Sequence, residues 1–162
     1  LAYDLVLRQR GLGWLCYAGA FPLLLAWTWM AAGGSLPPGW PLLLPLAALA
    51  GPTIHLANSL VDLDADEQAG ATSLATSLGE DRAPFVLAIL TASIYVLAWV
   101  ILLRLADPSP AALAAATAAT LCAGLGVSLS WRSAGRAREH GWLLQAAGMA
   151  LLAVAWVAAA DA

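Results

Sequence analysis

Residues 84–103 read PFVLAILTASIYVLAWVILL and carry no charged side chain. About 20 consecutive apolar residues are what an α-helix needs to cross the hydrocarbon core of a bilayer. In lipid the backbone must satisfy its own hydrogen bonds, and a helix does so within a single segment. This stretch therefore predicts a membrane-spanning helix, and with it an α-helical membrane protein.

Four more stretches have the same length and polarity, with proline and glycine in the gaps: residues 12–32, 40–61, 111–130 and 142–160. Apolar residues make up 62% of the chain and charged residues 10%, against about 25% charged residues in a soluble domain. We therefore predict an all-α membrane protein with about five transmembrane helices, forming one transmembrane domain over residues 1–162. The second span contains three prolines, so we expect part of it to be kinked or unwound.

The arginines predict the orientation. Six of the seven basic residues fall on one side of a five-span chain, and only Arg104 falls on the other. Because loops rich in arginine stay in the cytoplasm, we expect the motif loop, residues 62–82, on the cytoplasmic side of a bacterial-type plasma membrane. The net charge of −3 argues against nucleic acid as a partner.

One cluster of polar residues stands at the end of the second span. Asn58, Asp62 and Asp66 are spaced four residues apart, so on a helix they line one stripe. Two carboxylates one turn apart repel each other unless a cation or water separates them. Mg²⁺ takes oxygen ligands and keeps positions open for substrate phosphates. The stripe therefore predicts a Mg²⁺ site facing a diphosphate, with Asp64 pointing elsewhere.

Other interpretations stay open. The acidic residues could form a solvated turn of a non-catalytic polytopic membrane protein, or belong to half of a transporter whose broken helix is the proline-rich second span. A phosphatidyl-transferring enzyme would carry an Asp-Gly pair, which the sequence lacks. His55, one turn deeper than Asn58, is either a packing residue or a direct contact to substrate.

The stretch from Asn58 to Asp66, followed by Gly70, Thr72 and Leu78-Gly79, resembles the second aspartate-rich motif of the UbiA superfamily of intramembrane prenyltransferases. Residues 3–8 resemble the tyrosine-to-lysine segment of that family, with an arginine where a lysine is usual. The fold implied is that of helices five to nine of a nine-helix bundle, with residues 1–162 as the C-terminal portion of a larger prenyltransferase domain.

The resemblance implies an enzyme that transfers a prenyl group from a prenyl diphosphate to a hydrophobic acceptor in the membrane, such as an aromatic ring, a quinone precursor or a lipid alcohol. Its cofactor would be Mg²⁺, held by Asp62, Asp66 and Asn58, of which the two aspartates are the catalytic candidates. The expected substrate contacts are Tyr3, Arg8, His55, Asp64 and Thr72.

The sequence departs from the family in one respect. The family uses two aspartate-rich motifs, and this sequence contains only the second. It also starts at Leu1 without a methionine, so we expect a missing N-terminal half that carries the first motif. On this interpretation residues 1–162 alone would not release diphosphate from a prenyl diphosphate.

Overall fold

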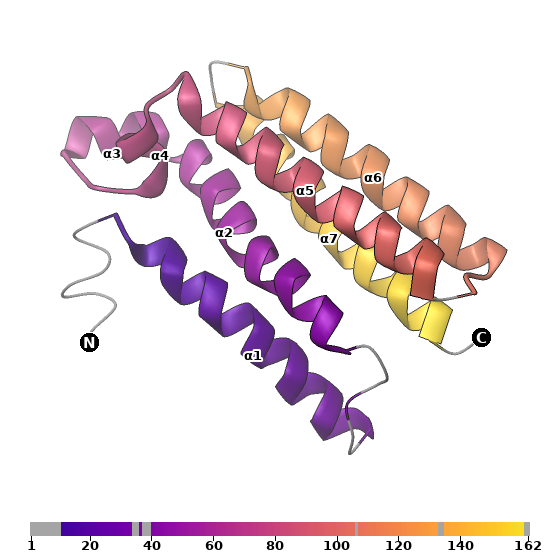
Figure 1. Ribbon diagram of the computed structural model, residues 1–162. Helices are drawn as coiled ribbons and strands as arrows, with labels where there is room; N and C mark the ends of the chain where they lie inside the picture. The colour runs from indigo at the N-terminus through magenta and orange to yellow at the C-terminus, as the bar shows by residue number, and fades with distance from the viewer. Residues whose placement is uncertain (1–10, 34–35, 37–39, 106, 133–134, 161–162) are drawn as a thin grey trace. The chain divides into compact units, whose positions relative to one another are not determined.

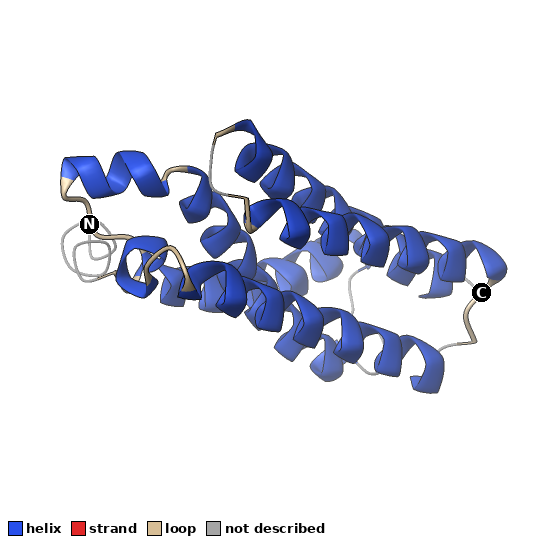
Figure 2. Cartoon of the chain, turned by 90° about the horizontal axis from the view of Figure 1, so that it is seen from above, coloured by secondary structure: helices blue, strands red, loops and turns tan. Residues whose placement is uncertain are grey.

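The computed structural model describes residues 11–33, 36, 40–105, 107–132 and 135–160. Every regular element in these ranges is helical, as Figure 2 shows. Five of the helices are long and apolar enough to cross a membrane. They are α1 (Gly13–Gly33), α2 (Leu43–Val61, preceded by the 3₁₀ turn η2, Trp40–Leu42), α5 (Arg82–Leu105), α6 (Pro110–Ser130) and α7 (Arg136–Ala160). The protein is thus an all-α membrane protein, as predicted.

The chain divides into two compact units, residues 1–83 and 84–162, and each is described by itself. In the first unit α1 and α2 run antiparallel, side by side (Figure 1). Gly51 of α2 lies directly against Tyr17 of α1, since a Cβ at Gly51 would be 2.4 Å from the Tyr17 carbonyl oxygen. A residue without a side chain at this point lets the two backbones approach closely.

The prolines of the second span disturb its start more than its middle. Pro41 lies in the 3₁₀ turn η2, and α2 begins two residues later, at Leu43. Pro45 lies in the first turn of α2, where the missing N–H has no intrahelical partner to lose. Pro52 is inside α2 and buried, and the helix continues through it to Val61. The expected unwinding is therefore confined to the first three residues of the span.

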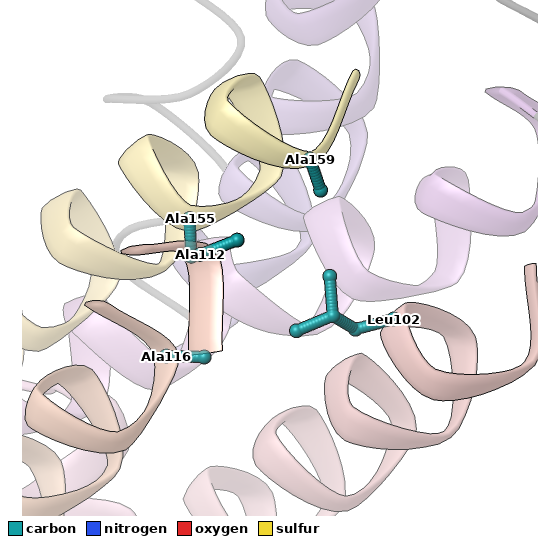
Figure 3. Close-up of a cluster of buried hydrophobic side chains, with 5 residues drawn as sticks. All are labelled: Leu102, Ala112, Ala116, Ala155 and Ala159. Atoms are coloured by element: carbon teal, nitrogen blue, oxygen red, sulfur yellow. The ribbon is translucent and has the colours of Figure 1, made fainter. Parts of the chain in front are cut away.

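The second unit is built on small residues. Leu102 of α5 forms one buried cluster with alanines of α6 and α7, namely Ala112, Ala116, Ala155 and Ala159 (Figure 3). A Cβ at Gly126 of α6 would be 2.6 Å from the carbonyl oxygen of Gly141 in α7, so these backbones are also in contact. Small side chains allow this approach, which van der Waals contact then stabilises in a medium where apolar burial gives no net gain.

A buried amide joins the three helices of this unit. The Gln145 side chain of α7 accepts a hydrogen bond from the Thr91 hydroxyl of α5 at 3.4 Å and donates one to the Ser130 hydroxyl of α6 at 3.3 Å. All three residues are buried. A polar group in the apolar interior is costly unless it is bonded, so these contacts favour one arrangement of the three helices.

Two boundaries differ from the expectation. Helix α7 begins at Arg136 instead of residue 142, because the charged residues 136–140 extend the helix and Arg138 Nε donates to the carbonyl of Arg132 at 3.2 Å. Residues 62–82, expected as a loop, contain the short helices α3 (Leu63–Ala69) and α4 (Leu74–Leu78). Gly70 caps the C-terminal end of α3, and Ser73 caps the N-terminal end of α4.

Candidate functional site

The aspartates lie where two helices meet, because α2 ends at Val61 and α3 begins at Leu63. Asp62 has φ −94° and ψ 4° and stands between α2 and α3. The backbone N–H of Asp66 donates to the carbonyl of Asp62 at 2.8 Å, the four-residue spacing of an α-helix. This bond forms the first turn of α3, so Asp62 and Asp66 lie one helical turn apart on one side of the chain.

Two glycines and a serine turn the chain back after α3. Gly70 has φ +64° and its N–H donates to the carbonyls of Asp66 and Glu67, so a residue that tolerates the left-handed conformation ends α3. Ser73 begins α4 with a capping box, in which its hydroxyl accepts from the N–H of Thr76 and the Thr76 hydroxyl accepts from the N–H of Ser73. Gly79 ends α4. These local contacts fold residues 70–74 back toward the aspartates.

The start of α1 lies against this turn. A Cβ at Gly11 would be 2.9 Å from the Ser77 hydroxyl and 3.3 Å from the Thr72 methyl carbon. Gly11 also has φ +67°, a conformation that glycine adopts without strain. The first turn of α1, the end of α2 and the α3–α4 segment therefore meet at one end of the first unit (Figure 1).

Between these segments is a cavity of about 840 Å³. Its lining comes from the start of α1, the second half of α2, α3 and the turn into α4: Gly11, Gly13, Tyr17, His55, Asn58, Ser59, Asp62, Asp66, Gly70, Ala71, Thr72, Ser73 and Leu74. This volume is within the usual range for ligand sites, about 300–1,000 Å³. Many of the lining side chains are polar, which suits a hydrophilic group at the end of a membrane helix bundle.

The oxygen atoms on one wall are of the kind that bind Mg²⁺. Asn58, Asp62 and Asp66 all line the cavity, and Asp66 is half-buried while the other two are exposed. Among the described residues, no three His, Cys, Asp or Glu side chains form a metal cluster by themselves. Mg²⁺ is usually bound through one or two carboxylates together with substrate phosphates, so two carboxylates and an amide oxygen form a suitable partial set.

Two aromatic rings line the cavity deeper along the helices. The rings of Tyr17 and His55 are stacked, with centroids 4.5 Å apart and an interplanar angle of 14°. The backbone carbonyl of His55 accepts a hydrogen bond from the Ser59 hydroxyl at 2.9 Å, and Ser59 also lines the cavity. The stacked pair and the aspartates thus contribute to the same site from different depths.

Most of the residues singled out from the sequence meet here. His55, Asn58, Asp62, Asp66 and Thr72 all line the cavity, whereas Asp64 is exposed and is not part of the lining. The remaining two candidates, Tyr3 and Arg8, lie outside the described residues.

Tyr17 and Ser59 are the polar lining side chains of the membrane helices that the sequence did not single out. Ser59 is adjacent to Asn58 and about 100° around the helix, so periodicity places it off the stripe. Tyr17 belongs to another helix, and no local pattern connects it with His55.

Comparison with known proteins gives one match. The sequence profile of the UbiA prenyltransferase family matches residues 1–146, which includes every described residue that lines the cavity. Neither the curated proteins nor the solved structures contain a significant match to the chain.

Proposed function

This chain belongs to the UbiA prenyltransferase family, and from that premise we propose that its cavity binds a prenyl diphosphate with Mg²⁺ for transfer of the prenyl group to a hydrophobic acceptor. The family as a whole implies intramembrane prenyl transfer. The observation that supports the finer proposal is the placement of Asn58, Asp62 and Asp66 on the wall of one polar cavity at the end of a membrane-spanning helix.

Each residue of this wall has a defined part. Asp62 and Asp66 supply negatively charged oxygens one helical turn apart, and Asn58 supplies a neutral one a turn further into the span. These three residues would hold Mg²⁺. When bound, Mg²⁺ supplies the positive charge that offsets the charge growing on the diphosphate as its bond to the prenyl carbon breaks. The chain's own role is to hold the diphosphate end of the donor at this wall.

The other proposed contacts come from the cavity lining for Thr72 and from the family resemblance for Arg8 and Tyr3. Thr72 lines the cavity from the turn after α3, and a threonine hydroxyl can donate a hydrogen bond to a phosphate oxygen. Arg8 is proposed as a cationic contact to the diphosphate, since an arginine forms paired hydrogen bonds with phosphate oxygens. Tyr3 is proposed as a further contact to the donor. The acceptor is a membrane-soluble molecule of the aromatic, quinone-precursor or lipid-alcohol class, and it reaches the prenyl carbon from the apolar part of the protein.

The test compares carboxylates that line the cavity with one that does not. The protein is expressed from its complete reading frame, placed in nanodiscs and titrated with geranyl diphosphate with and without Mg²⁺. We expect Asp62→Ala and Asp66→Ala each to weaken Mg²⁺-dependent binding by at least about tenfold, since the loss of even an outer-shell partner costs 10- to 100-fold in metal affinity. Diphosphate release, measured in parallel with a panel of acceptors, should fall in the same two variants.

Glu67→Ala is the matched control, because Glu67 is an exposed carboxylate of α3 that does not line the cavity. It should bind the donor as the unmodified protein does, and Asp64→Ala should have a smaller effect than either cavity aspartate. If all four variants lost Mg²⁺-dependent donor binding equally, binding would depend on the total negative charge of α3 and its surroundings and not on the carboxylates that line the cavity. Mg²⁺-independent binding would contradict the metal proposal.

A further inference from the structure

The stacked rings of Tyr17 and His55 are a built feature of the α1–α2 contact. His55 is the only ionisable side chain in α2, and its ring is stacked on Tyr17 with centroids 4.5 Å apart. Gly51 precedes His55 by one helical turn and also faces Tyr17, so its missing side chain is what lets the tyrosine lie against α2. An ionisable residue in a membrane span is costly and usually marks a functional position.

The pair lies at a useful distance from the aspartates. His55 precedes Asp62 by seven residues, which is about 10 Å along the helix axis. Both residues line the same cavity, and so does Asn58 between them. A donor whose diphosphate lies at Asp62 and Asp66 would thus leave its reacting carbon between the carboxylates and the ring pair. The acceptor must approach that carbon from the side away from the diphosphate, where the ring pair lies.

We propose that Tyr17 and His55 are the positioning residues for the acceptor, and that they select a hydroxyl-bearing flat ring over an aliphatic alcohol. This inference rests on the proposed function. The histidine edge can accept or donate a hydrogen bond with a ring hydroxyl. The outer face of either ring, which the other ring does not cover, would give a third ring an offset contact of the kind that aromatic pairs prefer. A flexible aliphatic alcohol offers the hydrogen bond but no face to stack.

The experiment measures acceptor binding directly. The protein expressed from its complete reading frame is placed in nanodiscs and titrated with 2-naphthol, whose own fluorescence reports binding against empty nanodiscs, with phenol and 1-decanol as competitors. The variants are His55→Ala, which removes ring and hydrogen bond, and His55→Phe, which keeps a ring. Ile54→Ala is the matched control, since Ile54 is a half-buried neighbour in α2 that does not line the cavity.

We expect His55→Ala to weaken 2-naphthol binding about tenfold, from the loss of a hydrogen bond and a ring contact together. His55→Phe should lose about threefold, because it keeps the stacked ring. Phenol should compete with 2-naphthol and 1-decanol should not. In the His55 variants, binding of geranyl diphosphate with Mg²⁺ should fall less than binding of 2-naphthol. In Ile54→Ala both should stay within about twofold, because Ile54 does not line the cavity.

The two proposals fail in different ways. If the unmodified protein does not bind geranyl diphosphate with Mg²⁺, the proposed function is wrong, and 2-naphthol binding that depends on His55 would still support the ring pair as a binding site. If donor binding is normal but 2-naphthol does not bind, or binds equally well to His55→Ala, the inference is overturned. Equal competition by 1-decanol would overturn the selection of flat rings.

Discussion

Replacing Gly51 with alanine should push α1 away from α2. A Cβ at this position would be 2.4 Å from the carbonyl oxygen of Tyr17 and 3.1 Å from its Cβ, whereas ordinary van der Waals contact begins at 3.4 Å. The obstructing atoms belong mainly to the backbone, so no side-chain rotation relieves the overlap. Helix α1 must therefore recede by about 1 Å at Tyr17, the difference between 3.4 and 2.4 Å.

The free energy of this displacement follows from packing. Adding a methyl group to a closely packed contact costs about 1–3 kcal/mol. Alanine also gains about 1 kcal/mol over glycine in helix propensity, which would conceal part of the cost. Gly19→Ala in α1 makes the same exchange with no atom within 4 Å of the new Cβ. The difference between the two variants therefore isolates the packing cost, and we expect Gly51→Ala to be less stable by about 1–3 kcal/mol.

Unfolding in mixed micelles with rising SDS content, followed by tryptophan fluorescence, measures this difference. The same shift should weaken the stacking of Tyr17 on His55, because a gap of about 0.5–1 Å forfeits a quarter to a half of a van der Waals contact. Binding of 2-naphthol should then fall in Gly51→Ala and not in Gly19→Ala. Equal stability of the two variants would show that α1 does not lie as close to α2 as described.

Three further predictions concern the rest of the chain. Gly126→Ala should destabilise the protein by about 1–3 kcal/mol relative to Gly124→Ala, since a Cβ at Gly126 would be 2.6 Å from the facing helix and one at Gly124 has no atom within 4 Å; thermal unfolding in detergent compares the two. Gln145→Leu should cost only about 0.6–1.7 kcal/mol, from the average to the largest value measured for hydrogen bonds between membrane helices, and a larger loss in the same assay would contradict this expectation. Cysteines placed at Asp81 and Asp107, in a background without the two native cysteines, should react with an impermeant reagent from opposite sides of the membrane. Helix α5 between them is about 36 Å long, and labelling of both from one side would refute the topology.

The five spans could be predicted from the sequence because lipid leaves an apolar run of about 20 residues few alternatives to a helix. The charged residues 136–140 misled that reasoning, since they continue α7 beyond the apolar stretch instead of forming a loop. Helices α3 and α4 were missed for a different reason. They are too short to show a periodic pattern, and they are held by caps at Gly70 and Ser73.

The sequence by itself grouped the polar residues at the end of the second span. The four-residue spacing of Asn58, Asp62 and Asp66 predicted that they lie together, and all three line one cavity although α2 ends at Val61 and α3 begins at Leu63. The partnership of Tyr17 with His55 was decided by tertiary structure alone. It requires α1 to lie against α2, and Gly51 permits this by presenting bare backbone where any side chain would hold the helices apart. Contacts between distant segments depend on such packing, which no periodicity within either helix records.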